Sequence, residues 1–258
     1  MCRILLFFLV LAFCCPAFGE ITSSSAQFPD VLRIAYPNFP PFHWEDETGR
    51  IRGMFYEIVT EALEKRMHQH LHWTAYPWAR CQELLKDGQE DAIITVPTKE
   101  RNTYTWTHDH PFFYKPLHLF TSAGHPRFSE INRIRTLADI KDLGLSVITY
   151  SENGWHFSHI KSLGIKSYES ASLHNVWVML AAHRGDLVIE WPRGARPDLR
   201  RLGLQNVVVD TGIEVAQMPF YLLIRQGSPQ VRHLGQFDRT IQSMVADGTI
   251  ATILQRYE

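Results

Sequence analysis

Residues 91–113 combine a buried strand, a turn and a basic side chain in an order suited to binding an anion. Residues 92–96 form a short, β-branched apolar run, which predicts a buried strand that stops at Pro97. Thr98 then stands where a helix N-cap belongs, and Arg101 follows three residues later, in the first turn. Free backbone N–H groups, the helix dipole and a guanidinium together favour a carboxylate ligand. The alternative is an ordinary surface arginine at a helix start.

Strand and helix patterns alternate along the rest of the chain. Apolar runs predict strands at residues 31–35, 71–75, 92–96, 145–149, 187–189, 207–209 and 220–224. Apolar residues at helical spacing, bounded by turn signals, predict helices at residues 55–67, 78–86, 137–141, 155–163, 176–182, 229–244 and 250–256. Pro37, Pro40 and Pro41 impose an extended loop after the first strand. This alternation predicts an α/β protein with mainly parallel sheets flanked by helices, in two lobes without a long linker.

Residues 1–19 have the features of a cleaved secretory signal. The start is basic at Arg3, an apolar segment spans residues 4–13, and small residues precede the expected cleavage point. That apolar segment is shorter than the roughly 20 residues of a membrane span, and no later segment is long and apolar enough. Lipid attachment at Cys14 or Cys15 is the alternative to simple cleavage. We therefore expect an exported protein without a membrane helix.

Loss of the signal changes the cysteine and charge balance. Of the 4 cysteines only Cys81 remains, so the mature chain can hold no internal disulfide and must depend on its core. A chain of 258 residues less the first 19 is long enough for two modest lobes. The net charge of −1 becomes −2 once Arg3 is lost. Mixed charges near neutrality argue against a nucleic-acid binder.

Six short motifs stand along the mature chain: P-N-F-P-P-F at 37–42, G-x-x-x-E-I at 53–58, D-G-Q-E-D-A-I at 87–93, T-K-E-R at 98–101, T-L-A-D-I-K-D-L at 136–143 and D-G-T-I-A-T-I-L-Q-R-Y at 247–257. In this order and spacing they resemble the periplasmic solute-binding proteins of family 3, the polar amino-acid receptors of ABC importers. The resemblance runs from about residue 32 to residue 257. Any one motif is weakly specific, whereas the six together are strongly so.

The resemblance implies a two-lobe clamshell of the type II periplasmic-binding-protein fold. It places the first lobe at residues 28–115 and 217–258 and the second lobe at residues 116–216. Two crossovers between the lobes are expected near residues 116–120 and 217–220. Such a receptor closes on its ligand about a hinge, because contacts from both lobes favour the closed state. The family further implies a monomer without a cofactor that works in the periplasm with a membrane ABC permease.

The resemblance also assigns candidate ligand-binding residues. Arg101 matches the arginine that takes the ligand carboxylate, and Thr98 matches the threonine that caps the turn beside it. Phe39 and Trp78 match aromatic walls that could clamp a flat or cationic ligand. Core packing or loop stapling is the alternative for these two rings. Ser151 is a further candidate in the second lobe.

Some positions depart from the family pattern. The polar residues that usually precede the threonine are replaced by Ile94 and Val96, of which Val96 is kept as a ligand-site candidate. Trp191 occupies the position at which the family usually has the acid that pairs with the ligand ammonium. Glu190 is one residue earlier, and residues one position apart on a strand point to opposite faces of the sheet. Arg80 is a second cationic candidate, or else a solvated helix-surface residue. Two arginines without a certain acid would suit a dicarboxylate or another organic anion.

Histidines and competing functions complete the predictions. His68, His70 and His72 alternate, and a second group surrounds His108, but neither has the partners of a recognisable metal site, so we expect surface or loop histidines and no metal. His43 is expected near the cleft or at its rim.

The leading function is capture of a small carboxylate-bearing solute. The alternatives are a clamshell enzyme of the cyclohexadienyl-dehydratase type, with Glu190 or Glu152 as the acid, and a receptor that docks on a signalling protein.

Overall fold

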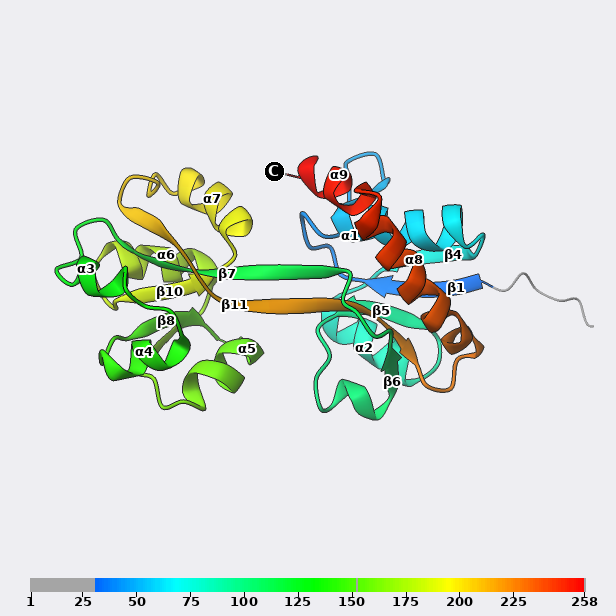
Figure 1. Cartoon of the computed structure of the whole chain (residues 1–258), viewed down its shortest axis with the longest axis horizontal. Coiled ribbons are helices and arrows are strands. Elements are labelled where there is room, and N and C mark those ends of the chain that lie inside the picture. The colour runs from blue at the N-terminus through cyan, green and yellow to red at the C-terminus, as the bar shows by residue number, and fades with distance from the viewer. Residues whose placement is uncertain (1–30, 152, 258) are drawn as a thin grey trace, which may run out of the picture.

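The computed structural model describes residues 31–151 and 153–257, which form two lobes (Figure 1). Two long strands, β7 (Phe113–Ser122) and β11 (Val208–Arg225), run side by side from one lobe to the other. The first part of the described chain and the C-terminal helices occupy one lobe, and the middle of the chain forms the other. No helix of the described residues is long and apolar enough to cross a membrane. The signal expected at residues 1–19, with Cys14 and Cys15, lies outside the described residues.

The first lobe is built on three parallel strands. β1 (Val31–Tyr36) pairs in parallel with β4 (His70–Ala75) on one side and β5 (Ala92–Thr95) on the other. The small strands are β2 (Trp44–Glu45), β3 (Ile51–Arg52) and β6 (Thr105–Thr107). The helical segments are α1 (Met54–Thr60), its π-helical continuation η1 (Glu61–Arg66), α2 (Trp78–Lys86), the 3-10 turns η2 (Arg101–Thr103) and η4 (Pro229–His233), α8 (Leu234–Ala246) and α9 (Thr249–Gln255).

The second lobe repeats this plan. β8 (Val147–Tyr150) pairs in parallel with β9 (Ser167–Ser170) and with β10 (Leu187–Glu190). Its helical segments are α3 (Phe128–Ile131), α4 (Leu137–Asp142), α5 (Gly154–His156), its π-helical continuation η3 (Phe157–Lys161), α6 (Leu173–Ala181) and α7 (Pro192–Arg201). Helices therefore flank the parallel strands in both lobes (Figure 1).

The two crossing strands join these groups into one mixed sheet in the order β4-β1-β5-β11-β7-β10-β8-β9. β11 pairs antiparallel with β5 of the first lobe, and β7 pairs antiparallel with β10 of the second lobe. Between the lobes β7 and β11 pair with each other, with register shifts between Asp210 and Ala216. The lobe boundaries predicted at 115/116 and 216/217 fall inside these crossing strands and stay predictions.

Neighbouring residues of the parallel strands enter different hydrophobic clusters. Ile34 belongs to the largest cluster and Ala35 to a second one, while Val147 belongs to the largest cluster and Ile148 to a third. Successive strand side chains point to opposite faces, so both faces of the sheet are covered. This explains why the inner strands β5, β8 and β10 appear in the sequence as short, mainly apolar runs without polar alternation.

Most of the predicted elements are confirmed within a few residues, and α2 coincides with its predicted range. The prediction of a helix that begins at Thr98 is wrong, because only the three-residue 3-10 turn η2 forms there. The strands β2, β3, β6 and β9 and the helices α3 and α7 were not predicted. α7 contains Gly194 and Pro197, which interrupt the pattern from which a helix would be inferred.

Candidate functional site

The candidate residues of the first lobe follow the carboxyl ends of its parallel strands. Phe39 follows β1, Trp78 follows β4 and Arg101 follows β5. Because these strands are parallel, their carboxyl ends lie at one edge of the sheet. Three segments that are distant in the sequence therefore meet at this edge.

The strand register shows which way this edge faces. Thr95, at the end of β5, pairs with Tyr221, whereas Ala92, at its start, pairs with Ile224. β11 enters the first lobe from the second lobe as its residue numbers rise. The end of β5 is therefore the end nearer to the second lobe.

The second lobe presents the matching edge. Tyr150 and Ser151 stand at the end of β8, and Glu190 and Trp191 at the end of the parallel strand β10. The ring of Trp191 stacks on Phe42 of the first lobe, with ring centroids 5.0 Å apart. The carboxyl ends of the strands in the two lobes thus face each other, which is where open α/β sheets bind ligands.

Arg101 is held by three parts of the first lobe. Its guanidinium lies over the ring of Trp78, 5.1 Å from the centroid. Nε and Nη2 donate to Gln82 Oε1 at 3.3 and 3.2 Å, and Nη1 donates to the Val96 carbonyl at 2.9 Å. The Thr98 hydroxyl accepts a hydrogen bond from the Arg101 backbone N–H at 3.1 Å, so Thr98 closes the turn as expected. Burial lowers the pKa of Arg101 from its usual range, and the guanidinium keeps its proton, as arginines in proteins do.

The helix α2 explains how this cluster is assembled. Trp78 and Gln82 are four residues apart and share one face of the helix. Arg80 lies on another face, is about half exposed and forms an ion pair with Glu83 at 3.2 Å. The structure therefore brings Trp78, Arg101, Val96 and Thr98 together and leaves Arg80 outside their contacts. Gln82 was missed, although its helical spacing from Trp78 was a usable signal.

The two candidate residues of the proline loop, Phe39 and His43, differ in their exposure. Phe39 is 53% exposed and stacks on Phe42, with centroids 5.1 Å apart, so one face of its ring is supported. The expectation for His43 is wrong, because His43 is buried and its Nδ1 lies 2.8 Å from the Pro37 carbonyl oxygen. Burial lowers the pKa of His43 to about 4. His43 therefore supports the loop as a neutral side chain.

Glu190 is already paired in the second lobe. Its Oε1 accepts from Lys115 Nζ at 3.3 Å and from the Trp191 backbone N–H at 2.8 Å. Lys115 comes from the crossing strand β7, and the two side chains are only 14% and 12% exposed. Burial, with the nearby Glu190 carboxylate, raises the pKa of Tyr150 to about 12. Lys115 and Tyr150 are neighbours that the sequence reasoning missed.

Ser151 is exposed, and its hydroxyl donates to the Ser170 carbonyl at 3.2 Å. A cavity of about 340 Å³ lies between the end of β8 and the helical segments α5 and η3. Tyr150, Asn153, His156 and Phe157 are among the residues that line this cavity. The end of β8, the strand that precedes Ser151, is therefore hollowed. Glu152, the alternative acid, lies outside the described residues.

The histidine groups do not form a metal site among the described residues. His108 was expected at the surface or in a loop; it lies in a loop between β6 and β7, but its side chain is fully buried and not at the surface. Its Nε2 accepts a hydrogen bond from the Leu222 backbone N–H at 3.1 Å, and burial lowers its pKa to about 4. His110 pairs with Asp238 at 3.0 Å. This group ties α8 to the crossing strand β11.

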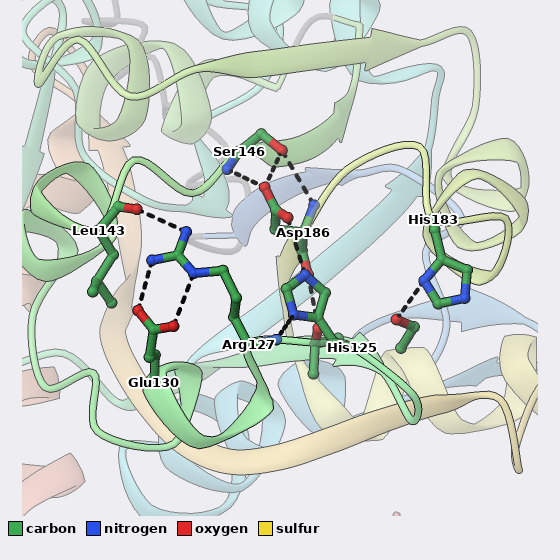
Figure 2. Close-up of polar contacts among 9 residues, drawn as sticks. His125, Arg127, Glu130, Leu143, Ser146, His183 and Asp186 are labelled. Atoms are coloured by element: carbon green, nitrogen blue, oxygen red, sulfur yellow. Dashed lines mark hydrogen bonds and ion pairs between the residues drawn. The ribbon is translucent and has the colours of Figure 1, made fainter.

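A second polar network in the other lobe contains serine, histidine and aspartate (Figure 2). Asp186 accepts from the Ser146 hydroxyl at 2.6 Å and lies 3.0 Å from His125 Nε2. The aspartate stands between the other two side chains, so among the described residues the Ser146 hydroxyl bonds to a carboxylate and not to the histidine, unlike the serine–histidine–aspartate order of a hydrolase. Hydrogen bonds to Asp186 lower its pKa and fix the start of β10 beside β8.

Comparison with known proteins identifies the family. Residues 32–258 match the model of the bacterial extracellular solute-binding proteins, family 3, and the chain belongs to this family. No curated protein sequence matches the chain.

Solved structures show the same fold at low sequence identity. A probable amino-acid ABC transporter extracellular-binding protein, ytmK from Bacillus subtilis, is 16% identical with a TM-score of 0.67, over 89% of this chain and 98% of that one. The L-cystine solute receptor of Neisseria gonorrhoeae in its unliganded open conformation is 17% identical, with a TM-score of 0.64 over 88% and 92%. A histidine kinase sensor domain with similarity to periplasmic binding proteins is 17% identical, with a TM-score of 0.64 over 89% and 96%. The α/β clamshell prediction is therefore confirmed.

Proposed function

We propose that the protein captures a small carboxylate-bearing solute between its lobes, an amino acid or a close relative, and delivers it to an ABC importer. The observation that supports this proposal most directly is that Trp78, Gln82 and the Val96 carbonyl hold the guanidinium of Arg101 in place. A guanidinium has five N–H groups, and three of them are used by acceptors among the described residues. One N–H on each terminal nitrogen is left, the pair that can hold both oxygens of a carboxylate.

Capture would work through closure about the crossing strands. Arg101, Trp78 and Phe39 would contact the solute from the first lobe, and Ser151 and the Glu190 region would contact it from the second. A solute that contacts both edges at once binds the closed form more tightly and shifts the population toward it. The importer would then recognise the closed form.

The family and its neighbours support the cellular setting. The family name describes extracellular solute-binding proteins, and two neighbours are named as an amino-acid ABC transporter binding protein and an L-cystine receptor. We propose export to the periplasm through cleavage after residue 19, and a monomeric receptor. Amino acids and their relatives are therefore the first ligands to test.

Thermal unfolding of the mature protein tests this proposal with a panel of amino acids, dicarboxylates, 2-oxo acids and polyamines. At a concentration about 100 times Kd, binding adds roughly 2.7 kcal/mol, which raises Tm by about 5–11 °C at about 2–4 °C per kcal/mol. Arg101→Ala should abolish the shift that a carboxylate produces. Arg80→Ala is the matched control and should keep most of it, because Arg80 lies outside the Arg101 cluster. A shift that survives Arg101→Ala would refute the carboxylate anchor.

A sensing role is the second candidate, because a histidine kinase sensor domain shares the fold. A strain that lacks the protein separates the two roles. Lost uptake of the labelled ligand indicates transport, whereas intact uptake with lost ligand-dependent gene expression indicates sensing.

The dehydratase alternative receives less support. Glu190 is engaged by Lys115 and by the Trp191 N–H, which argues against a free acid at this position. Product formation from prephenate or arogenate by the purified protein would establish it.

A further inference from the structure

The Lys115–Glu190 pair is the feature of the facing edges that the proposed function leaves unused. Glu190 stands at the end of β10, where the second lobe faces Arg101, and its partner Lys115 belongs to the strand that connects the lobes. Both side chains are mostly buried, at 14% and 12% exposure, and Nζ lies 3.3 Å from Oε1. A charged pair held in this way is costly to break, because either partner alone would be a buried charge.

We infer that Lys115 takes, from within the chain, the place that a ligand ammonium would take against Glu190, so that the site selects carboxylates whose second polar group is neutral. This inference rests on the proposed function and narrows its ligand class. The ligands expected are 2-hydroxy and 2-oxo carboxylates, in preference to the zwitterionic amino acids of the same carbon skeleton.

Charge balance leads to this choice. Arg101 is a cation without a carboxylate partner among the described residues, while Lys115 and Glu190 cancel each other. A monoanion neutralises such a site, whereas a zwitterion leaves one positive charge uncompensated. The free oxygen of Glu190 could still approach an ammonium. That ammonium would then lie near the Lys115 charge, and the repulsion would offset much of the attraction.

A neutral hydroxyl avoids this repulsion. It can donate to the second oxygen of Glu190, because Lys115 and the Trp191 N–H both donate to Oε1. Tyr150, whose pKa is raised to about 12, stays protonated beside Glu190 and can donate to an oxo group. The neighbourhood of the pair thus offers partners for neutral oxygen groups.

Matched ligands test the inference by calorimetry on the mature protein. Two sets are suitable: alanine, lactate and pyruvate, and phenylalanine, phenyllactate and phenylpyruvate. In the set that binds, the hydroxy or oxo acid should bind at least about tenfold more tightly than the amino acid. Lys115→Met should reverse this preference by releasing Glu190 for the ammonium. Lys115→Arg, the matched control, should keep the preference of the parent.

Lys115→Met leaves the buried Glu190 carboxylate unpaired, which could destabilise the protein. The double variant Lys115→Met/Glu190→Gln controls for this effect. It removes both charges and should bind the amino and hydroxy acids about equally. Tighter binding of the amino acid by the parent, or an unchanged ratio in Lys115→Met, would overturn the inference while the proposed function stands. If the parent binds an amino acid and Glu152→Gln loses this binding, Glu152 pairs with the ligand ammonium in place of Glu190. That result would overturn the inference as well. If no carboxylate binds, the proposed function fails too. Binding that survives Arg101→Ala would refute the carboxylate anchor and, with it, the charge balance from which the inference is drawn.

Discussion

At the scale of single residues, the anchor Arg101 is defined by what surrounds it. Trp78 supports one face of the guanidinium, and Gln82 Oε1 accepts hydrogen bonds from two of its N–H groups. These contacts restrict the rotamers of a long side chain, so less entropy is lost when a carboxylate binds. The neutral amide of Gln82 orients the guanidinium without neutralising its charge.

This arrangement makes Gln82→Glu informative. A glutamate has nearly the same shape but would form an ion pair with Arg101 and compete with the ligand carboxylate. We expect ligand affinity to fall by at least about tenfold, equivalent to 1.4 kcal/mol, with little loss of stability. Isothermal titration measures the affinity. Glu83→Gln, next in the helix but paired with Arg80, is the control and should bind normally. Equal affinity in Gln82→Glu would mean that the carboxylate does not contact Arg101.

At the scale of elements, the start of α1 depends on a close approach to the proline loop. Gly53 precedes α1 with φ of 124°, a backbone conformation that L-residues with a side chain rarely adopt. A Cβ at this position would lie 2.3 Å from the Phe42 carbonyl oxygen. The glycine of the G-x-x-x-E-I motif therefore lets the loop and the helix meet, and the loop carries Phe39.

Gly53→Ala should consequently destabilise the protein by more than about 2 kcal/mol, through backbone strain and a steric clash. Gly49→Ala separates the two causes, because Gly49 has φ of 75° but no atom within 4 Å of the added Cβ. Its cost should be only about 1 kcal/mol. Chemical denaturation measures both free energies of unfolding. Equal costs would show that the contact with Phe42 relaxes freely.

At the scale of the whole molecule, the lobes share one hydrophobic cluster. It includes Phe42 and Ile34 of the first lobe together with Trp191 and Val147 of the second. Phe42 packs against Trp191 beside the crossing strands. The apolar surface near the hinge thus stays covered while the facing edges carry the polar groups.

Buried histidines in both lobes give the whole protein a pH-dependent stability. Burial lowers the pKa of His43, His108 and His156 to about 4, against about 6.5 in an unfolded chain. Between these values the unfolded chain binds more protons, so the stability present above pH 6.5 is lost as the pH falls toward 4. For the well-buried His43 and His108 the loss is at most about 1.4 kcal/mol per pH unit each.

Tm should therefore change little between pH 7.5 and about pH 6.5 and fall from there to pH 4.5. His43→Gln should flatten this dependence, even if its Tm at pH 7.5 is lower, because one buried titrating group is removed. His70→Gln, at an exposed position on β4, is the control and should keep the parent slope. A constant Tm over this range in the parent would contradict neutral, buried histidines.

Much of the fold follows from local patterns in the sequence. Short apolar runs predicted the parallel strands other than β9, and helical spacing predicted α2 within its observed bounds. The six motifs predicted the family, which the match over residues 32–258 confirms. Arg101 could be proposed as an anchor because its strand, its turn and its charge are contiguous in the chain. Such features depend on neighbouring residues, and a sequence displays neighbours directly.

The tertiary structure alone decided which distant residues are partners. Lys115 meets Glu190 only because β7 and β10 pair antiparallel, and that register is set by packing across the sheet. His43 and His108 appear as loop histidines in the sequence, yet tertiary packing buries them. The sequence by itself determined the class of protein and its first anchor. Charge pairing and burial, which are sums over residues far apart in the chain, were decided by the fold.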